Sequence, residues 1–223
     1  MTVESKSWEW SLIDPRSWQN PADEIHALLF RWKSRGFKSL LDLGCGLGRH
    51  ALFFARNGFS VFAFDLSLEA AERLRKNTLT EDLPIQVDHG DMIVLPYETN
   101  SLDTVLSYHV IYHSDTEGVQ KTVDEMIRVL KPGGEFFLTL GSKLSPAYAS
   151  HEYEKIDPHT IVKNEVGPEY GVPHFFTDKT LLEELFRGTE LITIRHIEEC
   201  LQNGSPDGKW RYFILGKKKE CAA

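Results

Sequence analysis

A glycine-rich turn between an apolar run and a helical pattern constrains this chain more than any other feature. The apolar run covers residues 39–43, Gly44, Gly46 and Gly48 follow at alternate positions, and residues 49–57 have the spacing of a helix. Glycine lets the backbone turn sharply and approach a ligand closely. The start of a helix adds free N–H groups and the positive end of a dipole. The order of strand, glycine turn and helix therefore predicts a nucleotide-binding α/β unit.

The spacing of the glycines argues against a dinucleotide cofactor. A G-x-G-x-x-G fingerprint that starts at Gly44 needs glycine at position 49, where the chain has Arg49. Asp42 stands two residues before the first glycine, where its charge would oppose a diphosphate but favour a ligand with an ammonium group. The pattern D-x-G-x-G-x-G resembles the first motif of class I S-adenosylmethionine (SAM)-dependent methyltransferases. The resemblance implies SAM as the cofactor and S-adenosyl-L-homocysteine as the product.

Composition and charge fit a globular enzyme without a membrane span. The chain has 223 residues, of which 41% are hydrophobic and 26% charged, as expected of one domain. No apolar run approaches the ~20 residues that span a bilayer, so we expect a cytoplasmic protein. Cys45, Cys200 and Cys221 are too widely spaced for a disulfide framework. The net charge of −8 makes nucleic acid an unlikely partner, and the basic run Lys217–Lys219 is expected to be a solvated tail.

The first 37 residues are expected to form a lid and a helix. Trp8, Trp10 and Trp18 are three of the five tryptophans of the chain, and they precede a helical pattern that begins near Pro21. Large aromatic side chains in an irregular segment need a surface to bury against. In methyltransferases of similar layout an N-terminal segment folds over cofactor and substrate. The resemblance therefore implies that Trp10 or Trp18 lines the site.

Further motifs extend the resemblance over residues 38–140. Asp65 closes the second apolar run about 20 residues after the glycines, where a carboxylate can accept both ribose hydroxyls. In the resembling family, the residue at the position of Asp91 accepts a hydrogen bond from the adenine amino group, and the residue at the position of Met92 packs on the adenine ring. Ser107 ends the fourth predicted strand, at the edge where open α/β sheets bind their ligands. The expected cofactor contacts are Asp42, Gly44, Gly46, Gly48, Asp65, Leu66, Asp91, Met92 and Ser107.

The order of the elements predicts an α/β fold of the Rossmann-like, doubly wound type. Strands at 191–197 and 210–215 resemble the antiparallel hairpin that ends the methyltransferase sheet. We expect seven strands, mostly parallel with the last antiparallel, helices on both faces, and a cap over the carboxyl edge. The single domain 1–223 is expected to comprise an N-terminal lid and helix (1–37), a SAM-binding core (38–140), a substrate cap (141–177) and a C-terminal helix and hairpin (178–223).

The cap region supplies the candidate substrate and catalytic residues. A connection longer than about 15 residues is usually functional when it is ordered, and the aromatic content of 141–177 favours order. The segment Val172–Phe176 resembles the tellurite-resistance-type branch of small-molecule methyltransferases, which is said to methylate soft oxyanions or small thiols. A general base is needed only for an acceptor that is protonated at neutral pH. His174 and His113 are the candidate bases.

Other residues near the expected site are candidates for substrate contact. They are Trp10, Trp18, Arg49, Tyr108, Tyr112 and His174. No metal site is expected, because His109-x-x-x-His113 has no acidic ligand at a suitable spacing.

Three functions remain open from the sequence. The first is SAM-dependent methyl transfer to a small-molecule acceptor by in-line displacement. The second is methyl transfer to RNA, peptide or protein. The third is a dinucleotide-dependent oxidoreductase or a SAM-binding module without catalysis.

Overall fold

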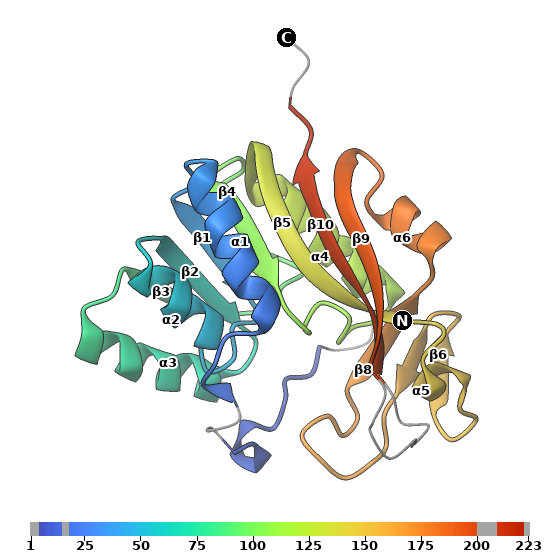
Figure 1. Ribbon diagram of the computed structural model, residues 1–223. Helices are drawn as coiled ribbons and strands as arrows, with labels where there is room; N and C mark the ends of the chain where they lie inside the picture. The colour runs from blue at the N-terminus through green and yellow to red at the C-terminus, as the bar shows by residue number, and fades with distance from the viewer. Residues whose placement is uncertain (1–4, 15–17, 200–208, 221–223) are drawn as a thin grey trace.

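A twisted sheet with helices on both faces forms the centre of the protein (Figure 1). The computed structural model describes residues 5–14, 18–199 and 209–220. Within them the main sheet has the order β3-β2-β1-β4-β5-β10-β9, in which β10 is antiparallel to both of its neighbours. The strands are β1 (Ser39–Leu43), β2 (Ser60–Asp65), β3 (Ile85–His89), β4 (Leu102–Ser107), β5 (Leu130–Ser142), β9 (Thr189–Glu199) and β10 (Lys209–Lys218). The predicted Rossmann-like fold class is confirmed.

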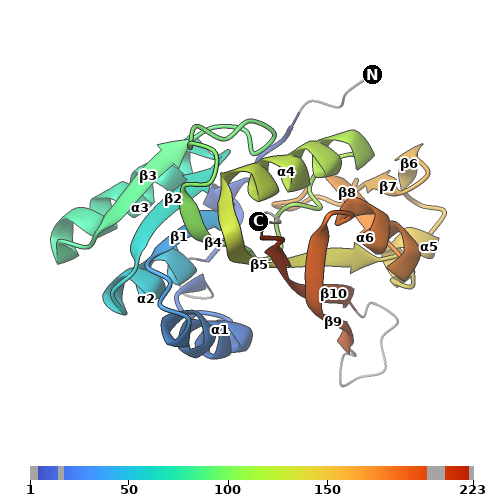
Figure 2. The same cartoon turned by 90° about the horizontal axis from the view of Figure 1, so that it is seen from above.

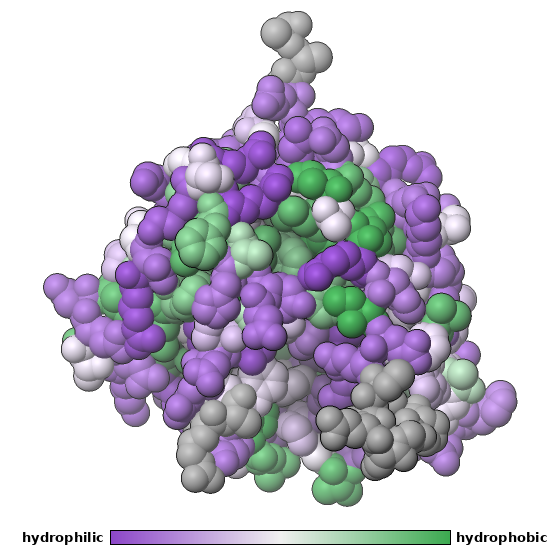
Figure 3. All heavy atoms as spheres, in the orientation of Figure 1, coloured by the Kyte–Doolittle hydropathy of each residue, from purple (hydrophilic) through white to green (hydrophobic). Residues whose placement is uncertain are grey.

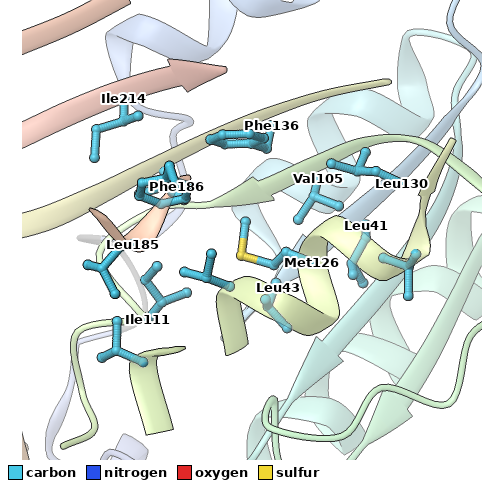
Figure 4. Packing of buried hydrophobic residues seen from close by; sticks show 14 of the residues in the cluster. Leu41, Leu43, Val105, Ile111, Met126, Leu130, Phe136, Leu185, Phe186 and Ile214 are labelled. Carbon is cyan, nitrogen blue, oxygen red and sulfur yellow. The ribbon is translucent and has the colours of Figure 1, made fainter. Parts of the chain in front are cut away.

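Helices cover the two faces of the sheet in separate layers. They are α1 (Asp23–Ser34), α2 (Arg49–Arg56), α3 (Leu68–Glu81), α4 (Thr116–Val129) and α6 (Lys179–Leu185). Figure 2 shows α1 and α2 on the opposite side of the sheet from α4. Because side chains alternate along a strand, Leu40 packs with α1 and α2, while Leu41 and Leu43 pack with α4 and α6 (Figure 4). The central strand β1 is thus buried on both faces, as expected of a parallel sheet.

Side-chain caps fix where two of the helices begin. Ser67 accepts the N–H of Ala70 at the start of α3, and Asp178 accepts the N–H of Leu181 at the start of α6. Such caps satisfy N–H groups that the helix itself leaves unpaired. Serine and aspartate are among the residue types preferred at this position.

The C-terminal strands are longer than predicted, and one expectation about them is wrong. Lys218 lies in β10, and its ammonium donates to the carbonyl oxygens of Ile127 and Leu130 at 2.8 and 2.9 Å. These carbonyls lie at the end of α4, where the helix supplies no donors of its own. Lys218 is therefore a helix-terminating contact and not part of a solvated tail. Cys200 and Cys221 lie outside the described residues.

The cap contains regular structure that the sequence did not indicate. Its elements are α5 (Pro146–Ala149), β6 (Glu154–Asp157), β7 (Thr160–Val162) and β8 (Pro173–Thr177). The end of β8 joins the end of β5 in parallel, through the pairs Gly141 with Phe176 and Ser142 with Thr177. These strands are too short for their sequence pattern to reveal them. Their pairing extends the sheet over the carboxyl edge, where the cap was expected.

The surface is mainly polar on the face shown in Figure 3, with a hydrophobic area between α1 and the strands β9 and β10. Ala27, Phe137, Phe213 and Leu215 line a hollow there. Within the part of the chain that the structure describes, every helix is too short or too polar to cross a membrane.

Candidate active site

A cleft lies at the carboxyl ends of β1, β2 and β4, under the N-terminal segment. It encloses about 870 Å³ of space, counting its open mouth. Many of the expected site residues line it: Gly44, Gly46, Arg49, Asp65, Leu66, Asp91, Met92, Tyr108, His113, Trp10 and Trp18. Residues that are far apart in the sequence, from Trp10 to His113, thus line the same cleft.

The three glycines of the turn have two different roles. All have positive φ, at 73°, 54° and 87° for Gly44, Gly46 and Gly48. A Cβ atom would lie 2.2 Å from Val110 at Gly44, 2.5 Å from the ring of Trp10 at Gly46 and 2.3 Å from Leu74 at Gly48. Only the first two glycines line the cleft. Gly48 opens α2 and packs on α3, so we assign it to the support of the turn and not to cofactor contact.

Asp65 combines a supporting role with a free binding capacity. Its side chain is buried, and its two carboxylate oxygens accept the N–H groups of Gly46 at 2.7 Å and Ser67 at 2.8 Å. Burial raises the pKa of Asp65, while these N–H groups oppose that rise. A carboxylate has about four acceptor positions, so about two remain for hydroxyl groups in the cleft. The turn is therefore held in shape before any ligand arrives.

Asp42 and Ser107 lie behind the wall of the cleft. Asp42 accepts the N–H of Ala51 at 2.9 Å, and burial raises its pKa to about 7. Ser107 donates its hydroxyl to the carbonyl of Leu43 at 3.0 Å. Neither side chain is part of the lining. Asp42 thus holds the first turn of α2, and its expected interaction with an ammonium group of the ligand stays a prediction.

Three tryptophans form a lid over the turn. The ring centroids of Trp8, Trp10 and Trp18 lie 5.6–5.9 Å apart, and Trp10 is buried against Gly46. The backbone N–H of Glu9 donates to the carbonyl of Pro168 at 3.2 Å, which ties the lid to the cap. The predicted positions of Trp10 and Trp18 agree with this arrangement.

Arg49 is a half-buried cation between aromatic rings. Its guanidinium lies 4.4 Å from the ring centroid of Trp18 and 5.7 Å from that of Tyr108. Burial lowers its pKa, although a guanidinium remains charged in proteins. No carboxylate of the described residues forms an ion pair with Arg49, and its side chain lines the cleft. Its charge is thus positioned for an anionic group of a ligand.

Two further histidines, His50 and His109, line the cleft, although neither was among the predicted site residues. Burial lowers the pKa of His50 to about 3 and also lowers the pKa of His109. Nδ1 of His109 lies 2.9 Å from the hydroxyl of Thr139, and Nε2 of His50 accepts the N–H of Ala22. Both imidazoles are therefore neutral at physiological pH. Only the helical spacing after Arg49 could have pointed to His50.

The two candidate bases lie together, but only one reaches the cleft. The rings of His113 and His174 have centroids 4.8 Å apart, and His113 alone lines the cleft. His174 and Tyr112 are buried behind the cleft. Neither lines it, although both were candidates for substrate contact from the sequence. Burial lowers the pKa of His113 well below its usual value, which leaves the imidazole neutral. Glu169 of the cap completes this group, and nothing in its sequence surroundings indicated it.

Comparison with known proteins identifies the core of the chain. Residues 41–138 match the family described as the methyltransferase domain. This range includes the glycine turn, Asp65, Asp91 and His113. The match covers less than half of the chain, and together with the fold it supports the prediction of a class I methyltransferase domain that uses SAM as its cofactor.

Individual relatives resemble this chain over part of their length. The chain is 38% identical over 103 residues to a sarcosine/dimethylglycine N-methyltransferase of Aphanothece halophytica, covering 45% of this chain and 36% of that protein. It thus spans about a third of that relative's length.

Solved structures share the fold at low sequence identity. A SAM-dependent methyltransferase of Methanosarcina mazei has a TM-score of 0.73 at 19% identity, with 91% of this chain and 100% of that chain covered. TehB of Haemophilus influenzae has a TM-score of 0.63 at 18% identity, with 89% and 64% covered. At such identities the likeness shows the fold alone, so membership of the tellurite-resistance-type branch stays a prediction.

Proposed function

We propose that the whole chain is a SAM-dependent methyltransferase whose acceptor is a small molecule. The observation that carries this proposal is the enclosure of the cleft, in which the ring of Trp10 lies directly over Gly46. A roof of packed tryptophans tied to the cap admits a small molecule more readily than a folded RNA or protein. The Aphanothece relative is named for two small amines, sarcosine and dimethylglycine, and supports the same class.

The residues of the cleft can divide the work between donor and acceptor. Bound SAM supplies a methyl carbon that its sulfonium already activates. Asp65 accepts hydrogen bonds from the ribose hydroxyls, and Asp91 accepts one from the adenine amino group. Arg49 pairs with a carboxylate of the ligand. Trp10 and Trp18 exclude water from the transfer, since the protein mainly positions and desolvates the nucleophile.

The acceptor determines whether a base is needed. A thiolate or an oxyanion needs none, whereas a protonated acceptor must lose its proton. Neutral His113 is the candidate that can take this proton, because its ring borders the cleft. His174 stands behind it and can only act through His113 or Glu169.

Ligand binding and methyl transfer test the proposal in two steps. SAM and S-adenosyl-L-homocysteine should raise the unfolding temperature, since ligands that bind the native state stabilise it. NADH should give no comparable rise, and a larger rise with NADH would support the oxidoreductase alternative. Transfer of tritium from methyl-labelled SAM is then screened over sarcosine, small thiols, phenols, selenite, tellurite and bulk RNA. Label in RNA and in none of the small molecules would overturn the proposed acceptor class.

A further inference from the structure

The group formed by His113, Glu169 and His174 contains two buried nitrogen atoms without partners. The Nε2 atoms of both histidines have no hydrogen bond among the described residues. Nε2 of His174 lies 3.4 Å from one carboxylate oxygen of Glu169, and Nε2 of His113 lies 3.9 Å from the other. The three potential ligand atoms lie within 4.8 Å of one another. Both histidine side chains are more than nine-tenths buried, at 9% and 4% exposed.

The orientation of His174 decides what its Nε2 atom can do. Its Nδ1 lies 2.9 Å from the carbonyl oxygen of Val172, which can only accept a hydrogen bond. Nδ1 therefore carries the proton in the neutral imidazole, and Nε2 presents a lone pair toward the carboxylate of Glu169. Two electron-rich atoms that face each other in a buried site are stabilised by a positive charge between them, either a proton on Nε2 or a metal cation. A backbone carbonyl behind the distal ring nitrogen is also the usual support of a histidine that binds a metal.

We propose that His113, Glu169 and His174 bind one divalent transition-metal ion of the zinc class. Two imidazole nitrogens and one carboxylate suit Zn²⁺, Co²⁺ or Fe²⁺, whereas Mg²⁺ prefers oxygen ligands alone. Zn–N and Zn–O bonds are about 2.0–2.2 Å long, so the side chains need only close slightly around the ion. Three protein ligands leave at least one coordination position open.

The backbone holds these ligands together although they come from distant parts of the chain. The N–H of Phe175 donates to the carbonyl of Tyr112 at 2.7 Å, which places His174 on β8 beside His113. Lys163 donates to the carboxylate of Glu169 and balances its charge while no ion is bound. The ammonium lies on Oε2, the oxygen that faces His174, so an ion would bind Oε1 or share Oε2 with Lys163.

The position of the site suggests its use. His113 also lines the cleft, and its ring centroid lies 5.4 Å from that of Trp8 in the lid. An ion held by His113 would border the acceptor side of the cleft and could hold an anionic atom of the acceptor at its open position. In that state His113 is a ligand and not a base. This catalytic use depends on the proposed function, but the binding of the ion does not.

Titration with Co²⁺ tests the site directly. The full chain is treated with a chelator, freed of it, and titrated with Co²⁺ without SAM, while visible absorption reports nitrogen ligation. We expect one ion per chain, displaced by Zn²⁺ but not by excess Mg²⁺. Glu169→Gln and His174→Ala should each weaken binding at least 10-fold. His151→Ala, which removes an exposed histidine of the same cap, should leave it unchanged.

Other outcomes would overturn the proposal. Absence of stoichiometric binding to the unsubstituted protein would do so whatever the variants show, and so would equal binding by His174→Ala. Circular dichroism of each variant shows whether it is folded, and a Zn²⁺-dependent rise in the unfolding temperature of the unsubstituted chain gives a measurement that needs no variant. SAM binding by the chelator-treated protein is measured separately. Failure of that binding would contradict the proposed function and leave the metal site standing.

Discussion

The two walls of the cleft differ in how completely their polar groups are satisfied. On the turn wall, both oxygens of Asp65 accept backbone N–H groups, and Asp42 accepts another behind it. The cap wall consists of His113 with Glu169 and His174 behind it. Both Nε2 atoms are buried there without a hydrogen bond among the described residues, 3.9 and 3.4 Å from the carboxylate of Glu169. The hydrogen bonds of the turn wall hold it in shape before a ligand binds, whereas the cap wall leaves two buried ring nitrogens for the metal ion that we propose.

The largest effect is expected from the buried charge behind the turn wall. Because the pKa of Asp42 is raised to about 7, the native state holds its proton more tightly than the unfolded state. Its contribution to stability is present below about pH 4 and is lost as the pH rises toward 7, by ~4 kcal/mol in all. The free energy of unfolding of Asp42→Asn, measured with urea, should therefore rise relative to that of the unsubstituted protein as the pH increases from 4 to 7. A constant difference between the two proteins from pH 4 to 8 would show that the carboxylate is not desolvated.

The glycines of the turn separate support from ligand contact. Gly48→Ala should lower the free energy of unfolding by about 3 kcal/mol, because it adds left-handed strain and a clash with Leu74. Gly46→Ala should cost only ~1–2 kcal/mol, since the nearby Trp10 ring can move. Its rate of methyl transfer should nevertheless fall by a larger factor than its folding equilibrium constant, because Trp10 can no longer pack against position 46. Denaturant unfolding and tritium transfer measured on both variants check this, and equal losses of both quantities would contradict it.

The next largest effect is expected on the affinity for SAM when the carboxylate of Asp65, the proposed acceptor for the ribose hydroxyls, is removed. Asp65→Ala should weaken SAM binding by ~1–3 kcal/mol, the scale of a lost buried polar contact. Glu72→Gln, which removes an exposed charge from α3, serves as the control and should bind SAM normally. Calorimetric titration gives both affinities. Unchanged affinity in Asp65→Ala would remove this carboxylate from the donor site.

The smallest effect concerns the cation between the walls. Arg49→Lys keeps the charge but loses the planar stack on Trp18 and Tyr108. We expect a loss of about 1 kcal/mol in binding of the anionic ligand group, or roughly 5-fold in its KM. If the KM for neither SAM nor the acceptor changes, Arg49 has no ligand on the cleft side.

The same contrast explains what the sequence could and could not predict. The turn wall comes from short segments that each end a strand, so the glycine spacing and Asp65 were sufficient to predict it. Yet the sequence could not show that Asp42 and Gly48 are absent from the cleft lining, because this depends on how α2 and α3 pack against β1 and the turn. The cap wall depends on the pairing of β8 with β5, and Glu169 lies in a loop with no periodic pattern. The spacing of residues along the chain therefore could not predict that His113, Glu169 and His174 lie together.

A crystal structure with S-adenosyl-L-homocysteine bound tests the central claim most directly, namely that the turn wall is a preformed donor site. We predict the ribose hydroxyls on Asp65, the adenine between Leu66 and Met92 with its amino group near Asp91, and the backbone of residues 44–48 unmoved. An adenosine bound elsewhere, or a turn that rearranges to receive it, would contradict the account.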